Sequence, residues 1–386
     1  MNFIKNALKN IAAMFISLLV GLIIGEVIIR IFFPQVISPV QFYYDSKLGG
    51  MVPVPNQKGF KSHPREYYYE YQNNEIGMRD TRQLNDYKKI PFKILAIGDS
   101  FTYGWGVNDD ETFCKLLEKK INRDSVAVLN AGASGSGTDY ALKFYEVRGP
   151  ELYPKVVLYF YYENDFVDNS ENRYFTIEQD SIVPKAVNEA TNLNAIQKNK
   201  LANSKVYNWF ASHSHLFNMI RTQVGIMWNK KVKQENQHQQ ATTQSATTDK
   251  KSATETATSS PTTPKIAEQP KTENDRFYPT YVYLKALAKN VEQSGGKFYT
   301  FFIPSNKSIA EFQKSGTMSH EKVIVDFCKV NNIKVYSFKD VIMKHKDPFK
   351  AYYFPTDLHW NKAGNQVAAD YLYQVLNQEL FSPQNK

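Results

Sequence analysis

The chain has 386 residues, of which 42% are hydrophobic and 22% charged, so it can build a packed core and is not a wholly disordered protein. Only one apolar run is long enough to cross a membrane, which excludes a protein with many spans. Two cysteines, Cys114 and Cys328, are too few for a disulfide scaffold or a multi-cysteine zinc site. The net charge of +9 is dispersed, which argues against a nucleic-acid partner.

The N-terminus predicts a transmembrane anchor. Residues 11–33 are almost wholly apolar, and a helix of that length reaches roughly 35 Å, enough for the hydrocarbon core of a bilayer. Lys5 and Lys9 precede this run, and positive residues favour the cytoplasmic side. We therefore expect residues 1–10 to be a cytoplasmic tail of a single-pass cell-membrane protein whose catalytic domain is extracytoplasmic.

Two charged residues interrupt the predicted span. Glu26 and Arg30 are four residues apart, so on a helix they share a face and can pair, or they can meet a partner membrane protein. A cleaved signal peptide is the alternative interpretation of the whole segment. It is disfavoured because apolar residues resume after Gly25 and no small-residue cleavage site follows.

The remainder of the chain divides by composition. Residues 34–91 are rich in Tyr, Pro and Asn and form a lead-in segment, with a short strand expected at Tyr67–Tyr71. Residues 92–386 are predicted to form one domain, in which 170–228 is a possible lid. Residues 229–276 contain no Phe, Tyr or Trp and are rich in Thr, Ser, Gln, Lys and Ala, so a disordered insertion of undetermined role is expected there.

From residue 92, apolar strands alternate with helix-like stretches. Five strands are predicted, at Phe92–Ile97, Val126–Asn130, Val156–Tyr162, Phe298–Ile303 and Lys334–Ser337. The helices are predicted at Glu111–Asn122 with Asp109 or Asp110 as cap, and at Asp139–Arg148, Tyr278–Gln293, Glu321–Asn331 and Lys362–Asn377. This alternation predicts an α/β fold with a parallel sheet and helices on both faces.

Residues with catalytic potential follow these strands. Ser100 comes after the first strand, Gly135 after the second and Asn164 after the third, and Asp357 and His359 precede the last helix. Ligands of open α/β sheets bind at the carboxyl ends of the strands, so we expect these five residues to meet at one edge. A serine, a histidine, an aspartate and hydrogen-bond donors are the components of serine acyl transfer.

Each residue has a distinct predicted role. Ser100 is the nucleophile, His359 the general base and acid, and Asp357 the group that orients His359 and stabilises its cation. The N–H groups of Ser100 and Gly135 and the side-chain amide of Asn164 are the expected oxyanion donors. Because Asp357 and His359 are two apart, an extended turn would point both side chains the same way.

Other interpretations of the same motifs carry less weight. The glycine-rich stretch 132–137 can be a simple turn, and it is not a phosphate loop, because no Gly-Lys-Ser or Gly-Lys-Thr follows. Asn164 can cap a helix. An Asp-x-His pair can bind a metal, but no further ligands are apparent, so neither metal nor cofactor is expected. His213 and His215 are interpreted as surface residues.

With these motifs in place, the sequence resembles the SGNH, or GDSL-like, hydrolase family. The matching blocks are Ile97-Gly-Asp-Ser-Phe-Thr-Tyr-Gly104, Asn130-Ala-Gly-Ala-Ser-Gly-Ser-Gly-Thr138, Tyr162-Glu-Asn-Asp165 and Asp357-Leu-His-Trp-Asn361. The resemblance implies a flavodoxin-like three-layer fold and activity on ester bonds. The Asp-x-His-Trp variant, where many members have Asp-x-x-His, is similar to the membrane-associated branch that includes alginate O-acetyltransferases.

The predicted function is a membrane-anchored serine esterase or O-acyltransferase acting on acyl esters of a glycan, with O-acetyl groups favoured. The alternatives are a lipid esterase or thioesterase, and a non-catalytic glycan-binding protein that keeps the fold. The expected partners are an acylated carbohydrate or lipid and the membrane. Hydrolysis versus transfer, the acyl group, its acceptor and the oligomeric state stay open at the level of sequence.

Overall fold

The computed structural model describes residues 2–170, 173–179, 181–185, 199–227, 230 and 273–381. The chain divides into two compact units, one with residues 1–37 and 210–271 and a larger one with residues 38–209 and 272–386. The lead-in segment, from residue 38 on, therefore belongs to the same unit as the predicted catalytic domain. Most of the predicted insertion at 229–276 lies outside the described residues, and its last four positions are already helical.

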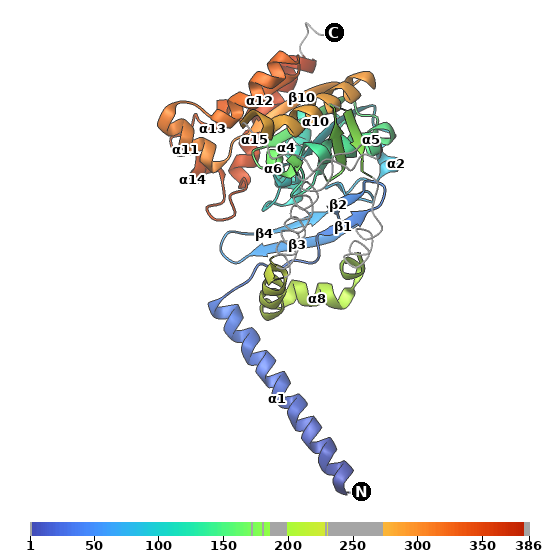
Figure 1. Ribbon diagram of the computed structural model, residues 1–386, viewed down its shortest axis with the longest axis vertical. Helices are drawn as coiled ribbons and strands as arrows, with labels where there is room; N and C mark the ends of the chain where they lie inside the picture. The colour runs from blue at the N-terminus through green and yellow to red at the C-terminus, as the bar shows by residue number, and fades with distance from the viewer. Residues whose placement is uncertain are drawn as a thin grey trace, which may run out of the picture. The chain divides into compact units, whose positions relative to one another are not determined.

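A parallel sheet of five strands forms the larger unit (Figure 1). Its strands are β5 (Phe92–Gly98), β6 (Val126–Gly132), β7 (Val156–Tyr162), β10 (Lys297–Ile303) and β11 (Lys334–Ser337). They lie in the order β11-β10-β7-β5-β6, and every neighbouring pair is parallel. Counted along the chain this order is 2-1-3-4-5, which is the flavodoxin-like arrangement. The predicted α/β fold is confirmed.

Helices cover both faces of this sheet and make it the middle of three layers. Alternate residues of a strand point to opposite faces, so Leu95 and Ile97 lie in one buried cluster and Ile94 and Ala96 in the other. The first cluster is completed by α5 (Thr138–Leu152), α10 (Glu273–Gln293) and α12 (Ser319–Val330), the second by α4 (Phe113–Ile121), α11 (Asn306–Ser315) and α15 (Lys362–Leu376).

Several helix boundaries differ from the sequence-based prediction. The helix expected from Glu111 begins at Phe113, because Thr112 is its cap: the hydroxyl of Thr112 accepts a hydrogen bond from the Lys115 N–H at 3.3 Å. Residues Asp109–Glu111 form a separate 3₁₀ turn. Helix α5 continues beyond the predicted end to Leu152, and α11 was not predicted.

Small antiparallel hairpins and short helices complete the larger unit. The hairpins pair β1 (Phe42–Asp45) with β2 (Gly50–Pro53), β3 (Lys58–His63) with β4 (Tyr67–Gln72), and β8 (Phe175–Glu178) with β9 (Ser181–Pro184). Along β4 the tyrosines at 67, 69 and 71 are buried while Tyr68 and Glu70 are exposed, as a half-buried strand requires. The short helices are α2 (Leu84–Tyr87), α3 (Ser100–Tyr103), α6 (Asp165–Ser170), α13 (Lys339–Ile342), α14 (Pro348–Tyr352) and the π-helical turn Asn377–Phe381.

The smaller unit contains α1 (Asn2–Phe32), which is long and apolar enough to cross a membrane and has none of its apolar window buried. The predicted pair is present: the Arg30 guanidinium lies 2.9 Å from the Glu26 carboxylate. Helix α8 (Lys205–His213) runs across the boundary between the units, and a further helix occupies residues 215–227. His213 is exposed as predicted, but His215 is only partly exposed, because its Nδ1 accepts a hydrogen bond from the Gln35 N–H.

Candidate active site

The topology of the sheet indicates where a ligand can bind. β5 and β7 are direct neighbours, although β6 separates them in the chain, so the direction of strand order reverses between them. At this reversal the connections leave to opposite sides, which opens a crevice at the carboxyl ends of the strands. Gly98, the last residue of β5, pairs with both Phe160 of β7 and Gly132 of β6. The loops after these three strands therefore start from one place.

Ser100 lies at the start of the short helix α3, directly after β5. The side chain of Asp99 caps this helix by accepting a hydrogen bond from the Phe101 N–H at 2.9 Å. A glycine is required at position 98, because a Cβ there would lie 2.3 Å from the Thr102 hydroxyl oxygen and 2.8 Å from the Phe160 carbonyl oxygen. This tight strand-to-helix turn places Ser100 at the sheet edge.

Ser100, His359 and Asp357 form one hydrogen-bonded chain. The hydroxyl oxygen of Ser100 is 2.7 Å from Nε2 of His359, and Nδ1 of the same ring bonds Oδ1 of Asp357. The prediction of an extended backbone between Asp357 and His359 is wrong, because Leu358, the residue between them, has a φ of +70°. Hydrogen bonds from the Leu358 N–H to the Phe354 carbonyl and from the Phe354 N–H to the His359 carbonyl close a compact loop instead. Such left-handed residues are costly and cluster at functional sites.

The hairpin of β3 and β4 holds this loop from the other side. The Tyr67 hydroxyl donates to Oδ2 of Asp357 at 2.7 Å and accepts from the indole N–H of Trp105 at 3.1 Å. The carboxylate of Glu66 accepts the backbone N–H groups of Thr356 at 2.5 Å and Asp357 at 2.9 Å. Sequence reasoning missed Glu66 and Tyr67, since they lie about 290 residues from their partners and no local motif marks them.

Two carboxyl groups of the site, the buried Asp99 and the partly buried Asp357, have opposite pKa shifts. Burial acts to raise the pKa of Asp357, but the hydrogen bond and charge of His359, together with the Tyr67 hydroxyl, outweigh it and hold the pKa below its usual value. Burial raises the pKa of Asp99 to about 6, against the lowering effect of His359 and of the Phe101 N–H. Asp357 therefore stays ionised beside the histidine at neutral pH, and it remains ionised to a lower pH than Asp99 does.

Gly135 and Asn164, two of the three residues predicted to supply oxyanion donors, belong to a second hydrogen-bonded group. Gly135 has a φ of +71°, and no atom lies within 4 Å of where its Cβ would be. Its carbonyl oxygen accepts a hydrogen bond from the Arg173 guanidinium at 2.5 Å. The Asn164 amide donates to Oδ2 of Asp168 at 3.1 Å, and Oδ1 of that carboxylate is 3.1 Å from Arg173. Sequence reasoning missed Asp168 and Arg173.

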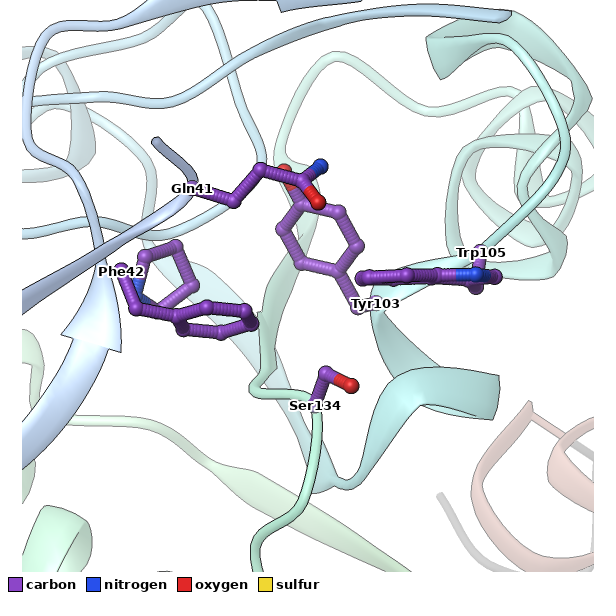
Figure 2. A pocket seen from close by; sticks show the side chains of 6 residues that line it. Gln41, Phe42, Tyr103, Trp105 and Ser134 are labelled. Carbon is purple, nitrogen blue, oxygen red and sulfur yellow. The ribbon is translucent and has the colours of Figure 1, made fainter. Parts of the chain in front are cut away.

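Aromatic side chains surround the catalytic histidine candidate. The ring centroids of Phe101 and Trp105 lie 5.0 and 5.9 Å from that of His359, and the Lys61 ammonium sits 3.3 Å from the Trp105 ring centroid. Figure 2 shows Trp105 and Ser134 at a crevice that is also lined by Gln41, Phe42, Pro53 and Tyr103. This crevice has no space for a water molecule, so it is a packed boundary of the site.

A larger, open hollow of about 420 Å³ lies on the β3–β4 hairpin. It is lined by Lys58, Gly59, Phe60, Tyr68, Glu70, Tyr71, Gln72 and Asp109. The rings of Phe60 and Tyr68 stack there with centroids 5.7 Å apart. Among the described residues, no group of three or more His, Cys, Asp or Glu side chains is placed to hold a metal ion.

No protein-family model and no curated relative matches this sequence. The solved structures that match include lipases, acylhydrolases and esterases. A lipase/acylhydrolase from Enterococcus faecalis is 11% identical, with a TM-score of 0.38 over 75% of this chain and 96% of its own. The esterase EstA from a Pseudoalteromonas species is 15% identical, with a TM-score of 0.36 over 75% and 99%. A GDSL-like lipase from Bacteroides thetaiotaomicron is 12% identical, with a TM-score of 0.33 over 75% and 89%.

Proposed function

We propose that this protein is a serine acyl-transfer enzyme that cleaves esters through an acyl-Ser100 intermediate. The observation that carries the proposal is the continuous chain from the Ser100 hydroxyl through His359 to the ionised Asp357. A serine, a histidine base and an orienting carboxylate in this order are the arrangement that activates a hydroxyl for attack on a carbonyl carbon.

The geometry supports a two-step reaction. In the first step His359 Nε2 accepts the Ser100 proton as the serine oxygen attacks the ester carbonyl, and the same nitrogen then protonates the leaving alcohol. In the second step water or an acceptor hydroxyl gives its proton to His359, attacks the acyl-serine and releases Ser100. Asp357 holds the ring and stabilises its cation in both steps.

The oxyanion of each tetrahedral intermediate is assigned to the N–H groups of Ser100 and Gly135 and to the Asn164 amide. Open space at Gly135 permits an oxygen to approach its backbone closely. The Asp168 carboxylate, itself paired with Arg173, restrains the amide group of Asn164. Pre-positioned donors of this kind stabilise the negative charge without reorganising during the reaction.

The favoured substrate is an acylated glycan, with an O-acetyl ester as the reacting group. The hollow on the β3–β4 hairpin combines stacked aromatic rings with charged and amide side chains, and this mixture suits sugar hydroxyls and ring faces better than a long acyl chain. The same hairpin carries Glu66 and Tyr67, which contact the Asp357 loop. Transfer to a second glycan and hydrolysis share the first step and differ in the acceptor.

Helix α1 is proposed to be a retained membrane anchor with the larger unit outside the cytoplasm. The end of α1 is hydrogen-bonded into folded structure: Glu26 accepts the backbone N–H groups of His215 and Leu216, and Arg30 donates to the His213 carbonyl oxygen. Cleavage of a signal peptide would remove these partners. Lys5 and Lys9 at the opposite end favour a cytoplasmic N-terminus.

A comparison of the full-length protein with its Ser100→Ala variant tests the enzymatic proposal. Release of p-nitrophenol from p-nitrophenyl acetate is followed in detergent, with and without an oligosaccharide acceptor, and acetylated peptides are sought by mass spectrometry. We expect turnover and an acetyl group on Ser100 in the wild type, and neither in the variant. Ser134→Ala, which changes a neighbouring serine at the crevice, is the matched control and should stay active. Equal turnover in wild type and Ser100→Ala would overturn the proposal.

A further inference from the structure

The helix at residues 215–227 starts against the end of α1. The Glu26 carboxylate accepts three hydrogen bonds there, from the Ser214 hydroxyl at 2.8 Å, the His215 N–H at 3.0 Å and the Leu216 N–H at 2.9 Å. Backbone N–H groups at a helix start have no partner within the helix, so a carboxylate from α1 satisfies them and complements the helix dipole. The beginning of this helix is thus fixed to the last turns of α1.

Arg30 and Gln35 strengthen the same junction. The Arg30 guanidinium donates to the His213 carbonyl oxygen at 2.6 Å while it pairs with Glu26. The Gln35 N–H donates to Nδ1 of His215 at 2.8 Å. The junction therefore involves side chains and backbone from both segments, which makes α1 and helix 215–227 parts of one folded unit, in agreement with the division of the chain by contacts.

Beyond the junction, the helix has an apolar stripe that faces solvent. Ile220, Val224 and Met227 are 50%, 56% and 68% exposed and recur at intervals of four and three residues, so they share one face. The polar Asn218 is buried instead, with its amide bonded to the carbonyl oxygens of Ala211 and Ser214, each at 2.8 Å. Leu216, Phe217 and Met219 are partly buried, whereas Ile226, on the side opposite the stripe, is 44% exposed. A helix that buries an asparagine and leaves an apolar stripe in solvent departs from the usual pattern of a water-soluble protein, whose apolar face points to the core.

A lipid bilayer is the partner whose chemistry fits this stripe. The helix is hydrogen-bonded at its start to α1, whose apolar side chains are exposed all round as a membrane span requires. The 13 described residues of this helix reach about 20 Å, and the exposed polar side chains of Thr222 and Gln223 beside the stripe suit a helix that lies at the membrane surface. Arg221 and the exposed Lys230 supply positive charge for lipid phosphates.

We propose that helix 215–227 lies in the interface of the outer leaflet beside α1, with Ile220, Val224 and Met227 among the acyl chains. The inference rests on α1 being the retained anchor and is independent of the ester chemistry. The protein would then contact the membrane in two ways, through α1 across the bilayer and through helix 215–227 along its surface.

Site-specific fluorescence quenching tests this placement in the full-length protein. Both native cysteines are buried, so a thiol-reactive NBD dye added to the folded protein labels an introduced cysteine selectively. Val224→Cys places the dye on the apolar stripe. Thr222→Cys, also exposed but on nearly the opposite side of the helix, is the matched control. Leu18→Cys places the dye in the middle of α1 and tests whether α1 lies in the membrane. Each is reconstituted in nanodiscs of phosphatidylcholine and phosphatidylglycerol, with or without lipids that carry a nitroxide on the acyl chain.

We expect the dye at position 224 to emit at shorter wavelength than at 222 and to be quenched by the nitroxide lipids at least twofold more, and the dye at position 18 to be quenched strongly. Equal, weak quenching at 222 and 224 with strong quenching at 18 would overturn the interfacial helix and leave the anchor in place. A blue-shifted but unquenched dye at 224 would also overturn it, by showing that protein covers the stripe. No quenching at 18 would overturn the anchor and this inference together.

Discussion

The two sides of Ser100 are organised differently. On the acid-base side, direct hydrogen bonds run from Ser100 through His359 to Asp357 and on to Tyr67 of the β3–β4 hairpin. On the oxyanion side, Gly135 borders open space and the Asn164 amide is bound to the Asp168 carboxylate. The proposed proton relay is thus assembled without substrate, whereas the amide proposed as an oxyanion donor is bound to a carboxylate with which a substrate oxygen must compete. Variants of each side separate the two contributions.

The largest effect is expected for Asp357→Asn. An amide in place of this carboxylate favours the wrong histidine tautomer and no longer stabilises the imidazolium, so kcat should fall by on the order of 10⁴-fold with little change in KM. Steady-state kinetics with p-nitrophenyl acetate measure this. Asp347→Asn, at the cap of α14, makes the same chemical change away from the site and should retain wild-type rates. Retention of a large part of the activity by Asp357→Asn would disprove the orienting role.

On the opposite side, Asn164→Ala should lower kcat by about 10²–10³-fold, since one oxyanion donor contributes about 2.7–4 kcal/mol to the transition state. Substrate binding in the ground state does not need this donor, so KM should change little. Acylation of Ser100, followed by rapid-quench mass spectrometry, should slow by the same factor as kcat when acylation is rate-limiting. A variant that acylates at the wild-type rate would exclude Asn164 from the oxyanion site.

A smaller effect is expected for Tyr67→Phe, which removes the second hydrogen bond to Asp357 and leaves the ring in place. A hydrogen bond to a charged group contributes about 1.5–3 kcal/mol, of which only part acts in the transition state, so kcat should fall roughly tenfold. The Tyr67 hydroxyl helps to lower the pKa of Asp357, so its loss raises that pKa. Steady-state kinetics with p-nitrophenyl acetate measure the fall in kcat, and NMR titration of the Asp357 carboxyl carbon measures the rise in its pKa.

The matched control for Tyr67→Phe is Tyr69→Phe, on the same buried side of β4. It should leave both kcat and the pKa of Asp357 unchanged. If the two variants behave alike, the hairpin acts on the site through general packing, and the specific hydrogen bond from Tyr67 to Asp357 has no role in the reaction.

Local sequence patterns were sufficient to predict much of this protein. The five strands were predicted to within two residues, because buried parallel strands are short apolar runs bounded by polar turns. The positions of Ser100, Gly135 and Asn164 after successive strands were predicted from the same alternation. Because ligands bind at the carboxyl ends of parallel strands, Asp357 and His359 were also predicted to lie beside Ser100, and the hydrogen bonds between them agree. The anchor-like helix and its Glu26–Arg30 pair also follow from composition and spacing alone.

Only the tertiary structure decided which distant residues support these motifs. Tyr67 and Glu66 reach the Asp357 loop across about 290 residues, and the left-handed Leu358 turns that loop so that its side chains meet the serine. Asp168 and Arg173 bind Asn164 and Gly135, the predicted oxyanion residues, from a segment without a recognisable motif. Likewise, helix 215–227 joins α1 through hydrogen bonds that join segments about 190 residues apart. The periodicity of apolar residues and the residue preferences of turns depend on neighbours a few positions away, so they can be recognised in the sequence. Contacts between distant segments form only when the chain folds.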